Sequence, residues 1–393
     1  MAIYFGWDIG GVHLKLARLE TGVPGHRAVL RTWIEPFEIW RDAGALPGRL
    51  RRMLRAARPG SRRTGGRRGG LEPPAPHAVT MTAELSDVFA ERAAGVRAIL
   101  SSCAAAFAPA TIGVLDLEAR LVTPGEALEW PLRVAAANFM ATARLAGRLC
   151  PSVLLIDVGS TTTDIIPIRG GRPRPHGRTD TERLVSGELV YTGLLRTPPG
   201  ALTDSVPLSG GRCRVSSEYF TIMADVYRLL GRIDEAEYTV PTPDGRGKGR
   251  ADAAARLARL VCSETATLGA EAIERIASFL EERQVERVAA AVSEVLARQP
   301  APRPARAVIA GAGSFLAEAA ARRAGLDPVP LTSLLPGIAG ERWDRAAPSA
   351  ALALLLAERA GETILSGSGS VRTGPGGRRG RPVRGGRPPE TVT

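Results

Sequence analysis

The sequence predicts an α/β protein built from two related halves. Strand-like apolar runs alternate with helix-like segments along the chain, which is typical of this class. Residues 3–17 (I-Y-F-G-W-D-I-G-G-V-H-L-K-L-A) and residues 153–168 (V-L-L-I-D-V-G-S-T-T-T-D-I-I-P-I) share one pattern: an apolar run, Asp-x-Gly, small or hydroxyl residues, and a second apolar run. With 393 residues the chain is long enough for two domains, so we expect a duplicated fold that holds a phosphate from two sides.

The first half begins with a β-hairpin over residues 1–20, because the glycines after Asp8 permit a tight turn. The elements that we expect after it are a strand within 27–40, a helix over 46–58, a strand over 77–85, a helix over 87–106, a strand over 111–117 and an Ala-rich helix over 138–150. We therefore predict a first domain at 1–150, with an Arg/Gly-rich insertion at 58–70.

The second half begins with the hairpin at 153–168, followed by a Gly/Pro turn at 170–177. The spacing of apolar residues predicts a helix over 215–231 and two helices within 251–297, broken near Val285. A strand at 305–310 leads into a turn and a helix, and a closing helix covers 346–356. The second domain is thus predicted at 151–360, and we expect a disordered basic tail at 361–393, where Gly, Pro and Arg dominate.

The net charge of +12 is concentrated in two segments. Residues 49–70 hold nine Arg and no acidic residue, and residues 361–393 hold six Arg and two Glu, so the rest of the chain is close to neutral. A basic segment attracts nucleic acid or anionic surfaces without specificity. We interpret both segments as solvated chain and predict no specific nucleic-acid partner.

The cysteines and histidines are too sparse for a metal cluster. The four Cys form no C-x-x-C pair and the four His lie far apart, so neither a zinc site nor a disulfide framework is expected. No run of 18 uncharged apolar residues occurs, and the start of the chain has the pattern of a strand rather than of a signal peptide. We therefore expect a cytoplasmic protein with no membrane partner.

The turn of the first hairpin carries groups that can bind a phosphate. Gly10 and Gly11 let the backbone approach an anion, and Asp8 at the strand end can hold a hydrated divalent cation. Lys15 follows on the returning strand, where its ammonium can meet a phosphate, and His13 lies within the turn. The alternative is a tight hairpin whose polar residues face the solvent.

The turn of the second hairpin gives a stronger signal. Four hydroxyl residues follow Gly159, between two carboxylates, Asp157 and Asp164, that can share Mg²⁺. A plain turn rarely needs so many hydroxyl groups between two acids. The candidate phosphate-binding residues in this turn are Gly159, Ser160, Thr161 and Thr162.

Two later segments supply further candidates. Gly311 and Gly313 lie in V-I-A-G-A-G-S-F-L, before a helix N-terminus that suits a phosphate or a nucleotide. In residues 179–198 polar groups among apolar ones could reach a substrate, although the segment could also be an ordinary loop and helix. The substrate candidates are Glu188, Tyr191, Thr192 and Arg196, while Asp244, Arg246 and Lys248 belong either to a substrate loop or to a surface turn.

The ordered set of two Asp-Gly hairpins and a late G-x-G turn resembles the actin–sugar kinase–Hsp70 superfamily. D-I-G-G near the start and D-V-G-S-T-T-T-D in the middle are similar to its hydantoinase A/oxoprolinase branch. Together with T-M-T-A-E-L-S-D-V-F, G-E-L-V-Y-T-G-L-L-R-T-P and M-A-D-V-Y-R-L-L-G, they resemble the family linked to tetrahydromethanopterin C1 transfer, whose archaeal members include a methanofuran-biosynthesis synthase. The resemblance covers residues 3–356 and implies duplicated actin-like domains of ribonuclease H type, with a ligand cleft between them.

This resemblance implies a transferase that joins an aminomethyl-furanmethanol diphosphate to the phenol of a glutamyl-tyramine or tyrosine unit. An aryl ether forms and diphosphate leaves, in the biosynthesis of methanofuran or methylofuran. We expect Asp157, Asp164, Lys15 and His13 to be catalytic. We also expect Mg²⁺ near Asp8, Asp157 and Asp164, where it would neutralise the departing diphosphate.

Some parts of this hypothesis stay open at the level of sequence. A phenol has a pKa of about 10, so a base would assist its attack, and His13, Glu188 and Asp164 are the candidates. The fold that the resemblance implies can accommodate ATP, but we do not expect the reaction to require it. The alternatives are an ATP-dependent kinase, an oxoprolinase-type amide hydrolase and a non-catalytic actin-like nucleotide-binding regulator. The partners that we expect are small molecules, and the oligomeric state is open.

Overall fold

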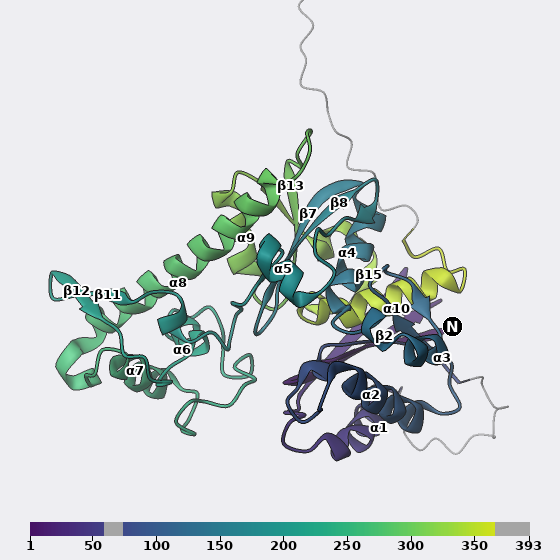
Figure 1. Ribbon diagram of the computed structural model, residues 1–393, viewed down its shortest axis with the longest axis horizontal. Coiled ribbons are helices and arrows are strands. Elements are labelled where there is room, and N and C mark those ends of the chain that lie inside the picture. The colour runs from purple at the N-terminus through teal and green to yellow at the C-terminus, as the bar shows by residue number, and fades with distance from the viewer. Residues whose placement is uncertain (59–73, 366–393) are drawn as a thin grey trace, which may run out of the picture.

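Two mixed β-sheets form the centre of the molecule, which the computed structural model describes over residues 1–58 and 74–365 (Figure 1). The first sheet has the strand order β15–β3–β2–β1–β4–β5–β6, and the second has the order β10–β8–β7–β13–β14, with β9 beside β8. The strands of the first sheet are β1 (Ile3–Ile9), β2 (His13–Thr21), β3 (Ala28–Pro36), β4 (His77–Met81), β5 (Ile112–Leu115), β6 (Leu121–Val122) and β15 (Ile338–Ala339). Those of the second are β7 (Ser152–Val158), β8 (Thr163–Arg169), β9 (Arg172–Pro173), β10 (Leu189–Val190), β13 (Arg306–Ala310) and β14 (Asp327–Pro330).

The two sheets repeat one arrangement. β1 pairs antiparallel with β2 and parallel with β4, and in the same way β7 pairs antiparallel with β8 and parallel with β13. The register agrees as well, because Asp8 lies opposite Lys15 in the first hairpin and Asp157 lies opposite Asp164 in the second. The predicted α/β fold with two related halves is confirmed.

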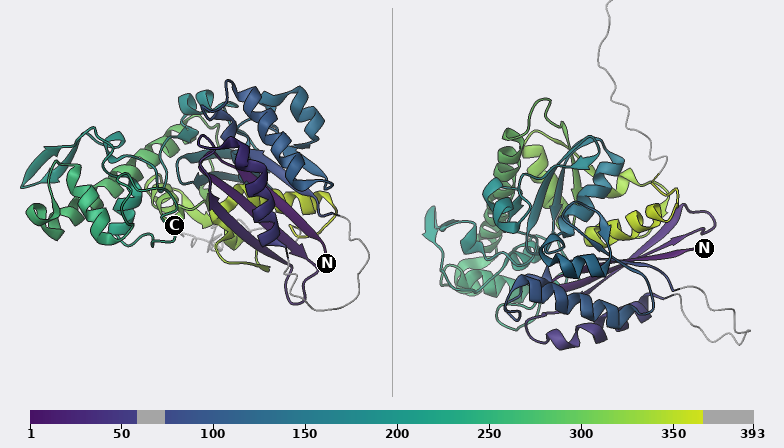
Figure 2. Two further views of the ribbon diagram at one scale, coloured as in Figure 1. Left: turned by 90° about the horizontal axis from the view of Figure 1, so that it is seen from below. Right: turned by 45° about the vertical axis from the view of Figure 1, so that its right-hand side comes forward.

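Helices cover both sheets and fill the space between them (Figure 2). α1 (Leu46–Ala57) and α2 (Arg92–Phe107) pack on one face of the first sheet. α8 (Thr265–Ala297) and α9 (Ser314–Arg323) pack on one face of the second. Between the sheets lie α4 (Asn138–Leu149) and α10 (Ala347–Arg359), which share one apolar core with both of them. The central strands are therefore buried on both faces, which explains their nearly continuous apolar sequences.

The end of the described chain returns to the first sheet. β15 pairs with β3, and α10 packs on β1 and β2. At Gly6 a Cβ atom would overlap the Ser349 carbonyl oxygen, so glycine is what lets α10 approach β1 this closely. β15 is thus a strand of the first sheet and α10 lies against it, although their residues were predicted in the second domain.

A smaller group of elements stands apart from the sheets, at the far end of α8 (Figure 1). It contains α6 (Met223–Leu229), α7 (Arg250–Arg259) and the hairpin of β11 (Ser205–Leu208) and β12 (Gly211–Arg214), with an apolar core of its own. The predicted break near Val285 is wrong, because α8 continues through this residue, which packs its side chain in the core of the second sheet. The chain breaks instead between α7 and α8, and α8 has a kink at Gly269, where φ is 74°. The helix expected over 215–231 begins only at Met223.

Two short helices, α3 (Pro124–Glu129) and α5 (Asp180–Ser186), complete the α-helices within 1–58 and 74–365. None of the helices in these ranges is both long enough and apolar enough to cross a lipid bilayer. The predicted insertion at 58–70 lies outside the described residues except for Arg58, and so does the predicted tail from residue 366 on.

The first residues of the predicted tail are packed rather than disordered. Ile364 and Leu365 are buried in the core between the two sheets. The Glu362 carboxylate accepts hydrogen bonds from the Tyr4 hydroxyl at 3.2 Å and from the Thr21 hydroxyl at 3.0 Å. The predicted start of the tail at residue 361 is therefore corrected, because an apolar pair within the Gly/Pro/Arg-rich composition is enough to dock this segment.

A chain that ends at Gly361 should be less stable than one that ends at Leu365. The loss of two buried apolar side chains and of the Glu362 hydrogen bonds should lower the free energy of unfolding by about 3 kcal/mol. Chemical denaturation of the two truncated proteins measures the difference. Equal unfolding midpoints would mean that residues 362–365 contribute nothing to the core.

Candidate functional site

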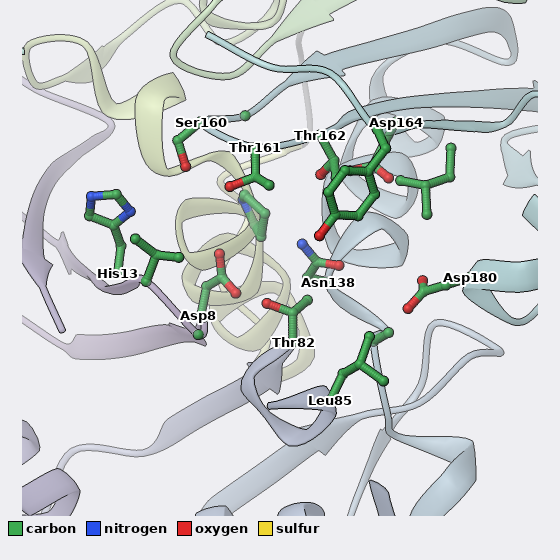
Figure 3. Close-up of a pocket in the computed structure, with 18 of the residues that line it drawn as sticks. Asp8, His13, Thr82, Leu85, Asn138, Ser160, Thr161, Thr162, Asp164 and Asp180 are labelled. Carbon is green, nitrogen blue, oxygen red and sulfur yellow. The ribbon is translucent and has the colours of Figure 1, made fainter. Parts of the chain in front are cut away.

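A cavity of about 630 Å³ lies where the two halves of the molecule meet (Figure 3). The turn after β1 and the residues after β4 line one side, while the turn after β7, α5 and the residue after β13 line the other. Because β1 and β4 are parallel, as are β7 and β13, the carboxyl ends of these strands open onto the cavity, as is usual for ligand sites in α/β proteins. The predicted site residues that line it are Asp8, Gly10, Gly11, His13, Lys15, Asp157, Gly159, Ser160, Thr161, Thr162, Asp164, Tyr191, Arg196 and Gly311.

Glu188, Thr192 and Gly313 are predicted site residues that do not line the cavity, and Thr192 is fully buried. The buried Glu188 carboxylate accepts hydrogen bonds from the N–H groups of His176 and Gly177 at 2.6 and 2.9 Å, so it shapes the loop before α5. Gly313 donates its N–H to the Val158 carbonyl at 2.9 Å, and a Cβ atom there would overlap the Val158 side chain. Glu188 is therefore structural rather than a substrate residue or a base, and Gly313 seats α9 against β7.

The two hairpin turns are closed in the same way. The Gly10 N–H donates to the His13 carbonyl at 3.0 Å, and the Gly159 N–H donates to the Thr162 carbonyl at 2.9 Å. We call residues 159–162 the hydroxyl turn. Its outer side is held by residues 194–196, whose N–H groups donate to the carbonyl groups of Gly159 and Ser160. The backbone of the hydroxyl turn is thus fixed from behind.

The hydroxyl groups of this region are of two kinds. The Thr163 hydroxyl donates to the Thr192 carbonyl at 2.8 Å and is structural. Ser160, Thr161 and Thr162 line the cavity (Figure 3), and their hydroxyl groups make no hydrogen bond within the described parts of the chain. Three free hydroxyl groups on a fixed backbone can donate to phosphate oxygens.

Lys15 brings a positive charge among the predicted carboxylates. Its ammonium group donates to the Asp8 carboxylate at 3.1 Å. Burial acts to lower the pKa of Lys15, but Asp8, Asp157 and Asp164 together outweigh it and hold this pKa above its ordinary value. Lys15 is therefore charged at neutral pH and can stabilise negative charge on a bound phosphate.

Asp157 is a buried carboxyl group whose pKa is raised to about 7. Burial is the main cause, and the charge of Asp164 adds to it. Lys15 and the Thr142 hydroxyl, which donates to Asp157 at 3.0 Å, lower this pKa only in part. A carboxyl group with such a pKa can take up and release a proton near neutral pH.

Asp164 forms an ion pair with Arg183, a cavity residue that the sequence analysis missed. The Arg183 guanidinium is buried and lies 3.7 Å from the centroid of the Phe139 ring. Burial raises the pKa of Asp164, and Arg183 opposes this shift. A carboxylate that already binds an arginine is poorly suited to hold a metal ion as well. No sequence signal distinguished Arg183 from the many other arginines of the chain.

Asp8 keeps one carboxylate oxygen for a ligand. Its Oδ1 atom is buried and has no hydrogen-bond partner, whereas Oδ2 binds Lys15. Among the described residues, no three His, Cys, Asp or Glu side chains come together as a metal site, so the three predicted aspartates do not form one by themselves. Mg²⁺ needs only one or two protein carboxylates when substrate phosphates complete its coordination, and Asp8 fits that requirement.

His13 is buried at one edge of the cavity (Figure 3). Burial, with a smaller contribution from Lys15, lowers its pKa to about 4, so the ring is neutral at neutral pH. Its Nε2 atom has no hydrogen-bond partner among the described residues. His13 can accept a hydrogen bond from a ligand, but the low pKa makes it a weaker base than Asp157.

Other cavity residues were missed although the sequence held a signal for one of them. Thr82 follows β4 directly and lines the cavity together with Asn138 and Asp180. Thr82 lies in the T-M-T-A motif, and the parallel pairing of β4 with β1 would have indicated its position. By contrast, Asp244, Arg246 and Lys248 do not line the cavity, and Asp244 forms an ion pair with the buried Arg256.

Exposed apolar side chains from both halves of the molecule also line the cavity. Leu85 and Tyr191 line it and have 60% and 67% of their surface exposed. Leu184 and Trp40 line it as well and are exposed. The Arg196 guanidinium lies 5.9 Å from the centroid of the Trp40 ring and so joins the two halves of the molecule. We call Leu85, Leu184 and Tyr191 the apolar wall.

The repeated sheets and the cavity between them define an actin/Hsp70/sugar-kinase-like fold. The nucleotide-free structure of acetone carboxylase has the same fold, with a TM-score of 0.52 and 11% identity, over 90% of this chain and 70% of that chain. The chain belongs to the hydantoinase/oxoprolinase family, whose model matches residues 76–340.

Two curated relatives are similar to this chain in sequence. Both are named (4-{4-[2-(gamma-L-glutamylamino)ethyl]phenoxymethyl}furan-2-yl)methanamine synthase. The relative from Methanocaldococcus jannaschii is 39% identical over 188 residues, which are 48% of this chain and 56% of the relative. The relative from Methanococcus vannielii is 40% identical over 118 residues, which are 30% of this chain and 53% of the relative. The matches thus span little more than half the length of these relatives.

Proposed function

We propose that this protein is a transferase of methanofuran or methylofuran biosynthesis, in the tetrahydromethanopterin-linked C1 pathway. It condenses an aminomethyl-furanmethanol diphosphate with the phenol of a glutamyl-tyramine or tyrosine unit. The products are an aryl ether and diphosphate. This group transfer is of the alkyl or aryl type, other than methyl. The names of the two curated relatives, which describe a phenoxymethyl-furan, support the proposal.

One observation carries the proposal: the cavity combines anion-binding groups with exposed apolar side chains. The hydroxyl turn and Lys15 can bind a diphosphate, and the apolar wall can pack against an aromatic ring. A substrate with a diphosphate on a furan ring and a second substrate with a phenol ring need both surfaces. A simple phosphate site would not need the exposed Leu85 and Tyr191.

In the proposed reaction the bond between the furanylmethyl carbon and the diphosphate oxygen breaks, and a bond from this carbon to the phenol oxygen forms. The furan ring stabilises positive charge on the carbon, so the main requirement is to stabilise the departing diphosphate. Lys15 and the hydroxyl groups of Ser160, Thr161 and Thr162 supply positive charge and hydrogen bonds to it. Mg²⁺, bound by Asp8 and the diphosphate, would supply further charge neutralisation.

The proton of the phenol needs an acceptor within the cavity. Asp157 suits this role best, because its pKa of about 7 keeps a large fraction of it ionised at neutral pH. Asp164 is paired with Arg183, Glu188 does not line the cavity, and His13 has a pKa of about 4. In this proposal Asp157 therefore replaces the three bases considered from sequence.

The direct test is incubation of the protein with the furan diphosphate, Mg²⁺ and either a tyramine-based or a tyrosine-based phenol, followed by mass spectrometry. The expected result is an aryl ether with one of the two phenols and one equivalent of diphosphate. Release of diphosphate without ether, or no turnover with either phenol, would contradict the proposal.

Replacing Tyr191 by Ala should raise the KM for the phenol about tenfold and leave the KM for the furan diphosphate nearly unchanged. The reason is that the exposed Tyr191 ring offers a stacking surface in the cavity. Steady-state kinetics with each substrate varied in turn measures the effect. Tyr191→Phe is the matched control, because it keeps the ring and should behave like the unchanged protein. An increase confined to the KM for the furan diphosphate would contradict the prediction, because it would mean that Tyr191 contacts that substrate instead of the phenol.

A further inference from the structure

We propose that Gln284 is a positioning residue that holds the hydroxyl turn in its anion-binding shape. Gln284 lies within α8, is fully buried and does not line the cavity. Its Nε2 atom donates hydrogen bonds to the Thr192 hydroxyl and to the Gly193 carbonyl, both at 2.8 Å. Its Oε1 atom accepts a hydrogen bond from the Tyr227 hydroxyl at 2.6 Å. A role of Gln284 in catalysis rests on the proposed function. Its hydrogen-bonded connection to the hydroxyl turn, which we call the mechanical link, does not.

The peptide that Gln284 holds packs directly against the hydroxyl turn. A Cβ atom on Gly193 would lie 2.7 Å from the Gly159 carbonyl oxygen and from the Thr161 backbone, so the two backbones are in contact. The next residue, Leu194, donates its N–H to the Gly159 carbonyl at 2.9 Å. A displacement of residues 192–194 must therefore displace the turn that carries the free hydroxyl groups.

The connection between α8 and this peptide is fully hydrogen-bonded. The Thr192 and Thr197 hydroxyl groups lie 3.0 Å apart, and the Gly193 N–H donates to the Thr197 hydroxyl at 3.0 Å. Gln284, Thr192 and Thr197 are all buried, so each lost partner would leave a polar group without water to replace it. Such a network selects one arrangement of the peptide, and hence one arrangement of the hydroxyl turn.

The variant Gln284→Leu preserves the approximate size of the side chain and removes both donors. We expect its affinity for inorganic diphosphate, measured by titration calorimetry, to fall about tenfold. The KM for the furan diphosphate should rise in parallel, while the KM for the phenol stays within about twofold of its usual value. Thr192→Val removes the hydroxyl that accepts one of the hydrogen bonds from Gln284, and it should have the same effect. Thr192→Ser keeps this hydroxyl and should bind diphosphate like the unchanged protein.

Tyr227→Phe is the matched control. It removes the hydrogen bond to Oε1 of the same buried amide but leaves both Nε2 donors in place. Its diphosphate affinity should stay within about threefold of the unchanged protein even if its melting temperature falls. Equal losses of affinity in Tyr227→Phe and Gln284→Leu would contradict the proposal. They would mean that Gln284 stabilises the fold in general and does not position the hydroxyl turn.

Hydrogen exchange tests the positioning role without the reaction. The amides of residues 159–162 and 193–196 should exchange faster in Gln284→Leu than in Tyr227→Phe. Unchanged exchange of these amides overturns the positioning role, whatever the activity. If the unchanged protein itself fails to bind diphosphate while the exchange difference is present, the proposed function is wrong and the mechanical link stands.

Discussion

Replacing Asp157 by Asn is expected to lower product formation about 100-fold or more and to stabilise the folded protein at alkaline pH. Both effects have one cause, because the carboxyl group is buried and its pKa is raised to about 7. The amide cannot accept the phenol proton of the proposed reaction, so turnover should fall. It also carries no charge, so the folded state no longer has to bury one.

The sign of the stability effect follows from the direction of the pKa shift. In the folded protein Asp157 binds its proton more tightly than in the unfolded chain, where its pKa is near the ordinary value of 3.8. The contribution of Asp157 to the free energy of unfolding is therefore greatest at acid pH. It falls as the pH rises towards 7 and stays low above that pH. The Asn variant should gain about 4 kcal/mol at pH 8 and much less at pH 4.

Two measurements check this expectation. The kcat/KM of the unchanged protein should rise with pH to a plateau above about 7, the pKa of Asp157. Chemical denaturation at several pH values should show the gain in stability of the variant. Asp116→Asn is the matched control, since Asp116 is buried outside the cavity and accepts hydrogen bonds from the Glu118 and Arg120 N–H groups. The Asp116→Asn variant should have a lower free energy of unfolding than the unchanged protein and the same rate of product formation. Near-normal turnover in Asp157→Asn would remove Asp157 from the mechanism.

Much of the fold and the two turns could be predicted because their signals are local. The pattern of an apolar run, Asp-x-Gly and a second apolar run predicted a hairpin at both places where it occurs in this chain, and its repetition indicated the duplication. The equal register of Asp8 with Lys15 and of Asp157 with Asp164 is the structural counterpart of that repeat. Residues within two or three positions of the turns were therefore found together in one cavity.

The parts that sequence did not predict depend on partners far along the chain. Glu188 looked like a substrate residue because a carboxylate in a polar run has no visible partner, yet the loop at His176 and Gly177 occupies it. Arg183 and the docking of Ile364 could not be inferred either, since both depend on tertiary contacts. The continuous α8 around Val285 reflects packing on the second sheet, which local spacing does not reveal.

Product should form without ATP, and inorganic diphosphate should compete with the furan substrate. The hydroxyl turn and the Gly10–Gly11 turn are closed alike and line one cavity, so they can bind the diphosphate of the substrate itself. Of the late glycine pair, only Gly311 reaches this cavity, while Gly313 packs under α9. An ATP site formed by both hairpin turns and the late glycine turn together is therefore not expected.

The assay is product formation with and without ATP at fixed Mg²⁺, with inorganic diphosphate and then a chelator added in turn. We expect equal rates with and without ATP, competitive inhibition by diphosphate, and a fall of about 100-fold or more with the chelator. Thr161→Val should weaken inhibition by diphosphate, because it removes one free hydroxyl of the turn without changing the size of the side chain. Strict dependence on ATP with one ADP per product would favour a kinase or an ATP-driven amide hydrolase. Tight binding of ATP with no turnover of any substrate would favour a regulator, and the raised pKa of Asp157 and the apolar wall would then serve no reaction.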